Sequence, residues 1–195
     1  QPVVPAYAGP GGDPSGTGLG QARSTGIDPQ RSALRETISY AEGTANADGT
    51  PNYSMRYGDS KGSPGTLDTT RPHPITPRPS PWGGSSGSNA SGAYQFLDST
   101  WNEMNDGSNA VMSGALQDRA VDRLIDERTD YDRDQPFADQ IPALSGKWAS
   151  FPNERGVSNY DQPVHSEQEL SDIYNQRLES NQLRMEEKLR QMGLR

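Results

Sequence analysis

One acidic residue stands where a helix is expected to bury an apolar side chain. Leu34, Ile38 and Glu42 follow one another at four-residue spacing, which places them on one stripe of a helix. Burial and the negative end of the helix dipole both disfavour a charged carboxyl, so we expect a raised pKa for Glu42. A carboxyl that keeps its proton near neutral pH can act as a general acid, for example toward a glycosidic oxygen. The spacing alone favours a structural role, in which Glu42 caps the helix or pairs with an arginine.

A second pair of residues suited to ligand binding is Tyr94-Gln95. An aromatic ring offers an apolar face to a sugar ring, and an amide can donate to and accept from hydroxyl and acetamido groups. The residue types alone favour a buried tyrosine followed by a surface glutamine. Trp101 and Trp148 each continue an apolar stripe, so we expect both in the core.

The sequence predicts neither a metal nor a cofactor. His73 and His165 are too far apart for a recognisable metal motif, and the chain has no cysteine. The acidic run over residues 126–134 lacks the glycine and glutamate positions of a calcium loop, so we interpret it as a solvated loop after a helix. No glycine-rich phosphate-binding motif follows a predicted strand.

The helix that carries Glu42 has clear start and stop signals. Asp28 is a typical N-cap, and Pro29 suits the first helical position, where an N–H would lack a partner anyway. Gly43 stands where many helices end in a left-handed residue. We therefore predict a helix that delivers Glu42 at its C-terminal end.

The remaining elements give an α+β class that is mainly α. An alternating stretch over residues 53–57 predicts one strand of a small β-hairpin that turns at Gly58-Asp59. Apolar periodicity predicts helical segments over residues 97–104, 114–129 and 166–192, and the region 137–148 supplies large apolar residues to the core around Pro142. The first half of the last helix should pack on the domain. Its second half has a thinner apolar stripe and should project toward solvent or a partner.

The composition indicates one domain with additional segments. The 195 residues are only 30% apolar and include 21 Gly and 16 Pro, which allows one core of ordinary size but not a chain packed end to end. We predict a flexible tail over residues 1–27, a folded domain over 28–178 and a helical extension over 179–195. The start without Met suggests a processed product or a piece of a longer protein.

The charge and hydropathy argue against two classes of partner. A net charge of −8 does not suit nucleic acid or anionic membranes, because both attract basic surfaces. No apolar stretch approaches the length of a membrane span, and the start lacks the charged and apolar regions of a signal peptide. We therefore expect a soluble protein that binds neither nucleic acid nor membranes.

Three short blocks of the sequence resemble signatures of the bacteriophage lambda endolysin family. The blocks are Ser39–Thr44 (SYAEGT), Gly92–Leu97 (GAYQFL) and Trp148–Pro152 (WASFP). They occur in the family's order and at comparable spacing, and the similarity covers about three quarters of the chain. There are departures: Ala93 replaces an arginine of the family's endolysin, and the proline-rich segment between the first two blocks matches little beyond its length.

The resemblance implies a lysozyme-like fold with a cleft that binds the glycan strands of bacterial peptidoglycan. It makes Glu42 the sole catalytic carboxyl and carries substrate contacts onto Thr44, Tyr94 and Gln95. The family is one of lytic transglycosylases, in which the C6 hydroxyl of muramic acid attacks C1 and leaves a 1,6-anhydro end. The alternative is a hydrolase with a second carboxylate. Candidates for that group are Asp48, Asp59 and Asp68, although aspartates in such loops more commonly stabilise turns.

The resemblance to phage enzymes leaves two biological settings open. A free endolysin would act from the host cytoplasm on the wall in the periplasm at the end of infection. A virion-borne lysin would open the wall locally during DNA entry. The acidic charge, the two tails and the absent Met favour the second setting, with other virion proteins bound through the tails. A further alternative is an inactive structural virion protein of the same fold, against which the presence of Glu42 argues.

Overall fold

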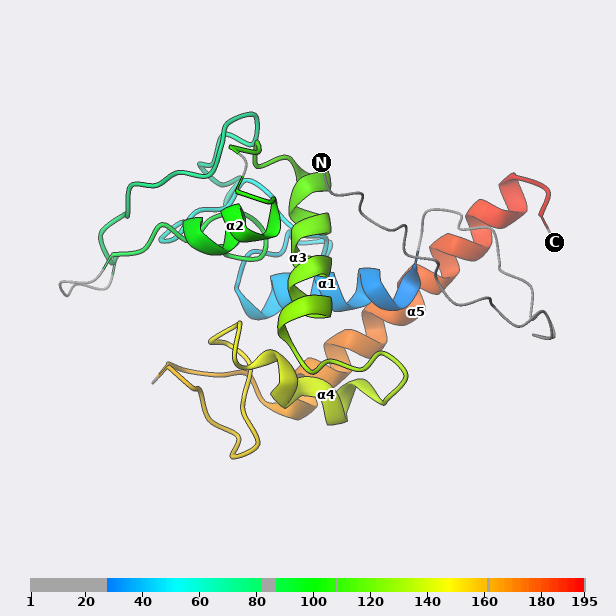
Figure 1. Cartoon of the computed structure of the whole chain (residues 1–195). Coiled ribbons are helices and arrows are strands. Elements are labelled where there is room, and N and C mark those ends of the chain that lie inside the picture. The colour runs from blue at the N-terminus through cyan, green and yellow to red at the C-terminus, as the bar shows by residue number, and fades with distance from the viewer. Residues whose placement is uncertain (1–27, 82–86, 108, 161, 195) are drawn as a thin grey trace, which may run out of the picture.

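The computed structural model describes residues 28–81, 87–107, 109–160 and 162–194, which form a mainly α fold (Figure 1). The tail predicted over residues 1–27 lies outside the described residues. The helices of the described part are α1 (Pro29–Ala41), α2 (Asp98–Met104), α3 (Gly114–Arg128), α4 (Phe137–Leu144) and α5 (Glu167–Gln191). Helices α1, α2, α3 and α5 fall on predicted helical segments, and α4 lies in the apolar region 137–148, so the mainly α class is confirmed. Within these ranges no helix is both long enough and apolar enough to cross a membrane.

Helix α1 lies at the centre of the molecule, where both α3 and α5 pack against it (Figure 1). The Asp28 side chain accepts hydrogen bonds from N–H groups of the first turn, as expected of an N-cap. Leu34 and Ile38 are at most 1% exposed, so the predicted stripe does face the interior. Gly43 has a φ of +71°, which turns the chain away from the helix axis immediately after Glu42. The helix therefore ends with Glu42 at the edge of the core.

One cluster of apolar side chains joins the helices to the loops between them. Trp101 and Trp148 both belong to this core, which confirms their predicted place. Phe137 of α4 stacks on Tyr174 of α5 with ring centroids 4.2 Å apart, which fixes α4 against the first half of α5. Because the sequence has no cysteine, this packing must supply the stability of the domain without disulfides.

The segment between α1 and α2 forms a lobe of long loops. The predicted hairpin is wrong: Arg56 makes an isolated antiparallel bridge with Ser91, and the Tyr57 N–H donates to the Ala90 carbonyl. The β structure among the described residues of the lobe consists of isolated bridges of this kind. Prolines explain the difference, because six of them stand between residues 64 and 81 and none can donate to a ladder.

Helix α5 runs unbroken for 25 residues from its N-cap Ser166. Its first half packs on α1 and α4, as predicted. Farther along, Asn181 stays buried because its amide donates to the Glu36 carboxylate of α1 at 3.1 Å. Beyond this contact Leu183 and Met192 are about half exposed, at 60% and 47%, and the end of the helix projects from the domain (Figure 1).

Candidate active site

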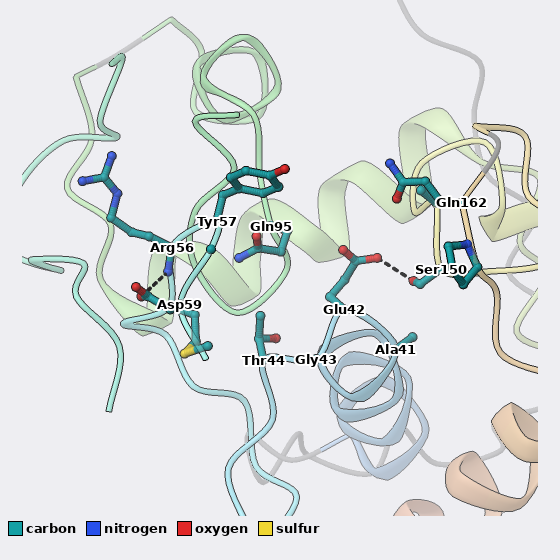
Figure 2. Close-up of a pocket in the computed structure, with 14 residues that line it drawn as sticks. Ala41, Glu42, Gly43, Thr44, Arg56, Tyr57, Asp59, Gln95, Ser150 and Gln162 are labelled. Carbon is teal, nitrogen blue, oxygen red and sulfur yellow. Dashed lines mark hydrogen bonds between the residues drawn. The ribbon is translucent and has the colours of Figure 1, made fainter. Parts of the chain in front are cut away.

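A cleft of about 730 Å³ opens at the C-terminal end of α1. Figure 2 shows Glu42 at its centre, with the loop lobe on one side and the segments around Ser150 and Gln162 on the other. The cleft thus lies between parts of the chain that are far apart in sequence. Its described lining residues are Ala41, Glu42, Gly43, Thr44, Met55, Arg56, Tyr57, Gly58, Asp59, Gln95, Ala149, Ser150, Gln162 and Pro163.

The Glu42 carboxyl is held in the cleft by Ser150. The Ser150 hydroxyl donates to Oε1 of Glu42 at 2.5 Å (Figure 2). Burial raises the pKa of Glu42, whereas the hydrogen bonds from Ser150 and the charge of His165 oppose the rise without cancelling it. No lysine or arginine of the described residues forms an ion pair with Glu42. A carboxyl whose pKa is raised in this way is suited to act as a general acid.

Asp59 lies on the opposite wall of the cleft, but its oxygens are occupied. Its Oδ1 is 2.7 Å from the Arg78 guanidinium, and Oδ2 accepts the N–H groups of Arg56 and Thr66, each at 2.9 Å. The Thr66 hydroxyl adds a further hydrogen bond. Burial works against the charged form, but the bonds from Arg78 and the backbone outweigh it and lower the pKa of Asp59. Asp59 is therefore a charged, fully bonded residue that shapes the lobe.

Asp48 and Asp68 lie outside the cleft lining and stabilise turns. Each is exposed, and its Oδ1 accepts from both the N–H and the hydroxyl of a threonine two residues later, Thr50 and Thr70 respectively. These hydrogen bonds lower the pKa of both aspartates. Their place in the structure agrees with the interpretation as turn residues.

Of the predicted Tyr94-Gln95 pair, the structure brings only Gln95 into the cleft. Gln95 has a φ of +50°, and its amide donates to the Gly92 carbonyl at 3.0 Å, which holds the side chain at the cleft wall. Tyr94 is 1% exposed, and its hydroxyl donates to Asp118 at 2.5 Å. The prediction that the Tyr94 ring lines the cleft is therefore wrong. The tight turn sends neighbouring side chains in opposite directions, and the larger, more apolar one is buried.

Thr44 lines the cleft but is only 3% exposed. Its hydroxyl lies 2.5 Å from the Ala93 carbonyl oxygen and 3.0 Å from the Ser39 hydroxyl. These bonds tie the turn after α1 to the Gly92–Leu97 block. The structure thus places Thr44 beside Glu42 as part of the framework that joins two of the sequence blocks.

Sequence reasoning assigned no role to several residues of the cleft, above all Tyr57, Arg56 and Ser150. Tyr57 is the one aromatic residue among the described residues of the cleft lining, and it is half-buried there. Arg56 is the only cation among the described lining residues, and its buried Nε has no hydrogen-bond partner. Ser150 belongs to the Trp148–Pro152 block, so the signal for it was present in the sequence, whereas the role of Tyr57 was hidden by its assignment to a strand.

The described residues contain no group of three or more His, Asp or Glu side chains arranged to hold a metal ion. His73 is instead a core residue, with Nε2 2.7 Å from the Phe96 carbonyl oxygen, and burial lowers its pKa.

A mainly α fold whose cleft presents one carboxyl of raised pKa at a helix end suits general-acid cleavage of a glycosidic bond. The chain belongs to the endolysin family, whose model matches residues 32–180. The solved structure of bacteriophage lambda lysozyme complexed with a chitohexasaccharide is similar, with a TM-score of 0.61 and 25% sequence identity over 77% of this chain and 95% of that chain. No curated protein matches the sequence. The predicted relationship to phage endolysins and the predicted lysozyme-like fold are confirmed.

Proposed function

We propose that this protein is a lytic transglycosylase that cuts the MurNAc–GlcNAc bond of peptidoglycan, with Glu42 as acid and then base. The Glu42 carboxyl gives its proton to the bridging oxygen while the bond from that oxygen to C1 of MurNAc breaks. The resulting carboxylate takes the proton of the C6 hydroxyl, whose oxygen forms the new bond to C1. The product carries a 1,6-anhydro ring, no water is consumed, and Glu42 ends protonated, as it began.

The observation that carries this proposal is the state of the two carboxyls of the described cleft lining. Glu42 has a raised pKa and one hydroxyl partner, whereas Asp59 is charged and bonded at both oxygens. A hydrolase needs a second carboxylate free to activate water or to attack the sugar. Asp59 would have to give up the Arg78 ion pair to serve in that way, at a cost that favours the single-carboxyl mechanism.

Substrate contacts follow from the same cleft. We assign Gln95 to hydrogen bonding with acetamido or hydroxyl groups of the substrate and the ring of Tyr57 to packing against a sugar. Thr44 would support the base of the substrate cleft. The neighbour's bound chitohexasaccharide supports a site for GlcNAc-type sugars. Peptidoglycan also bears carboxylates on its stem peptides, and we assign Arg56 of the cleft lining to pairing with one of them.

The test separates activity, residue and reaction type. Chloroform-treated Gram-negative cells should lose turbidity with the wild type and not with Glu42→Gln. Mass spectrometry of the released muropeptides should show anhydro ends, which lack one water relative to hydrolytic ends. Asp59→Asn and Asp161→Asn are included, the second because Asp161 lies outside the described residues. Reducing ends from the wild type would overturn the transglycosylase assignment, and absence of any clearing would indicate the inactive structural protein.

We further propose that the enzyme is carried by the virion and acts on the host wall from there. The net charge of −8 would not draw a free enzyme to an anionic wall, and the exposed apolar side chains Leu183 and Met192 give the end of α5 a surface for another virion protein. In this proposal residues 28–178 form the catalytic domain, and residues 1–27 and 179–195 form the attachments. Mass spectrometry of gradient-purified particles tests the setting, because a free endolysin would be lost during purification.

A further inference from the structure

His165 connects the two segments that hold Glu42. Its backbone N–H donates to the carbonyl of Ser150 at 3.1 Å, and its Nε2 lies 3.2 Å from the carbonyl oxygen of Ala41. Ala41 directly precedes Glu42, and Ser150 is the residue whose hydroxyl donates to Glu42. One residue thus joins the end of α1 to the opposite cleft wall.

The other ring nitrogen of His165, Nδ1, is held by contacts with α5 and α1. Its Nδ1 lies 3.0 Å from Oε1 of Glu169, and the same oxygen accepts the Tyr40 hydroxyl at 2.7 Å. The rings of Tyr40 and His165 have centroids 5.3 Å apart. Both ring nitrogens therefore face oxygens that only accept, and each nitrogen that carries a proton can donate to its oxygen.

The charged groups around His165 are few among the described residues. Glu42 and Tyr40 face it from α1 and its C-cap, and Glu169 faces it from α5. Beyond Tyr40, Lys61 lies 5.2 Å from the centroid of its ring, and Arg177 acts on its hydroxyl. The His165 ring thus lies between Glu169 on one side and Glu42 on the other.

We propose that His165 is the positioning residue of Glu42, because its hydrogen bonds to Ala41 and Ser150 hold the Glu42 carboxyl against the Ser150 hydroxyl. This inference rests on the proposed function of Glu42. The proposed mechanism gives Glu42 two tasks. Its carboxyl must hold a proton for the first step and remain stable as a carboxylate until the second. Burial serves the first task, and the second is served by the Ser150 hydroxyl that His165 holds in place, together with the charge of the His165 ring when it is protonated.

The two contributions can be separated by two substitutions. His165→Gln keeps an N–H that can reach the Ala41 carbonyl but removes the charge, whereas His165→Ala removes both. With His165→Gln we expect the descending limb of the kcat/KM profile, above which Glu42 loses its proton, to move to higher pH with KM little changed. With His165→Ala we expect the same movement together with a loss of about 10- to 100-fold in kcat, because Glu42 is no longer held in place. His165→Lys, which restores a cation, should return the limb toward its wild-type position.

A matched control is the chain's other histidine. His73 also has both ring nitrogens near carbonyl oxygens, those of Pro74 and Phe96, but it does not line the cleft. His73→Gln should leave the limb unmoved, and melting curves should show that every variant is folded.

A second readout does not depend on turnover. Titration of the Glu42 side-chain carboxyl by carbon NMR, assigned with Glu42→Gln, should show a higher pKa in His165→Gln than in the wild type. If neither the limb nor this titration moves while Glu42→Gln is inactive, the role of His165 is overturned and the proposed function stands. If the wild type cuts no peptidoglycan, the proposed function fails, and the NMR titration still decides whether His165 acts on Glu42.

Discussion

Removal of the Ser150 hydroxyl tests the electrostatics of the cleft most directly. This hydroxyl donates to Glu42 at 2.5 Å and helps to keep the pKa of the carboxyl below the value that burial alone would give. A hydrogen bond to a charged group contributes about 1.5–3 kcal/mol, and the carboxylate that forms when Glu42 gives up its proton would lose that contribution in Ser150→Ala. If the transition state carries most of this charge, kcat falls by about 10- to 100-fold.

The assay is release of soluble muropeptides from purified peptidoglycan, followed over a range of pH. Ser150→Ala should show the lower kcat together with a descending pH limb displaced to higher pH, because the carboxylate has become less stable. Ser158→Ala is a suitable control, since the Ser158 hydroxyl lies in the same region but donates to the Ala149 carbonyl. A kcat within about twofold of wild type, with an unmoved limb, would show that the short hydrogen bond does not tune Glu42.

Four further substitutions test other residues of the cleft and the core. Glu42→Gln should raise the melting temperature at neutral pH and leave it unchanged near pH 4. A carboxyl whose pKa is raised in the folded state lowers stability only at a pH where the unfolded chain ionises it. Each kcal/mol of stability recovered corresponds to about 2–4 °C, and an unchanged melting curve at neutral pH would contradict the burial effect. Arg56→Gln should slow cleavage of peptidoglycan by about tenfold and leave binding of a chitooligosaccharide, which has no carboxylate, unaffected in calorimetry; equal losses on both ligands would indicate that Arg56 only supports the lobe. Tyr94→Phe should lower the free energy of unfolding by about 1 kcal/mol in urea titration without raising KM, since it removes one of the two tyrosine hydroxyls that donate to the partly exposed Asp118, whereas Tyr57→Ala should raise KM in the same peptidoglycan assay.

The sequence was sufficient for the helix that carries Glu42. Its N-cap at Asp28, its stripe of Leu34 and Ile38 and its end at Gly43 are local signals, and all of them are met in the structure. The raised pKa of Glu42 was also predictable, because a carboxyl on an inward stripe must be poorly hydrated. Local periodicity therefore gives both the position and the electrostatic state of this residue.

The cleft opposite Glu42 was not predictable in the same way. Which member of the Tyr94-Gln95 pair faces the cleft depends on the left-handed backbone of Gln95, for which a glutamine gives no signal. The place of Tyr57 depends on a bridge between Arg56 and Ser91, which are distant in sequence. The contacts of His165 likewise join α5 to α1. Such pairings depend on tertiary packing, which a single sequence does not display.

Helix α5 is continuous, so its projecting end is rigidly connected to the domain. At 1.5 Å per residue, its 25 residues form a rod about 38 Å long, which begins beside His165 and ends in the exposed part of the helix. Asn181 fastens this rod to Glu36 of α1, the helix that ends at Glu42. A partner bound to the far end of α5 would therefore fix the direction in which the cleft faces.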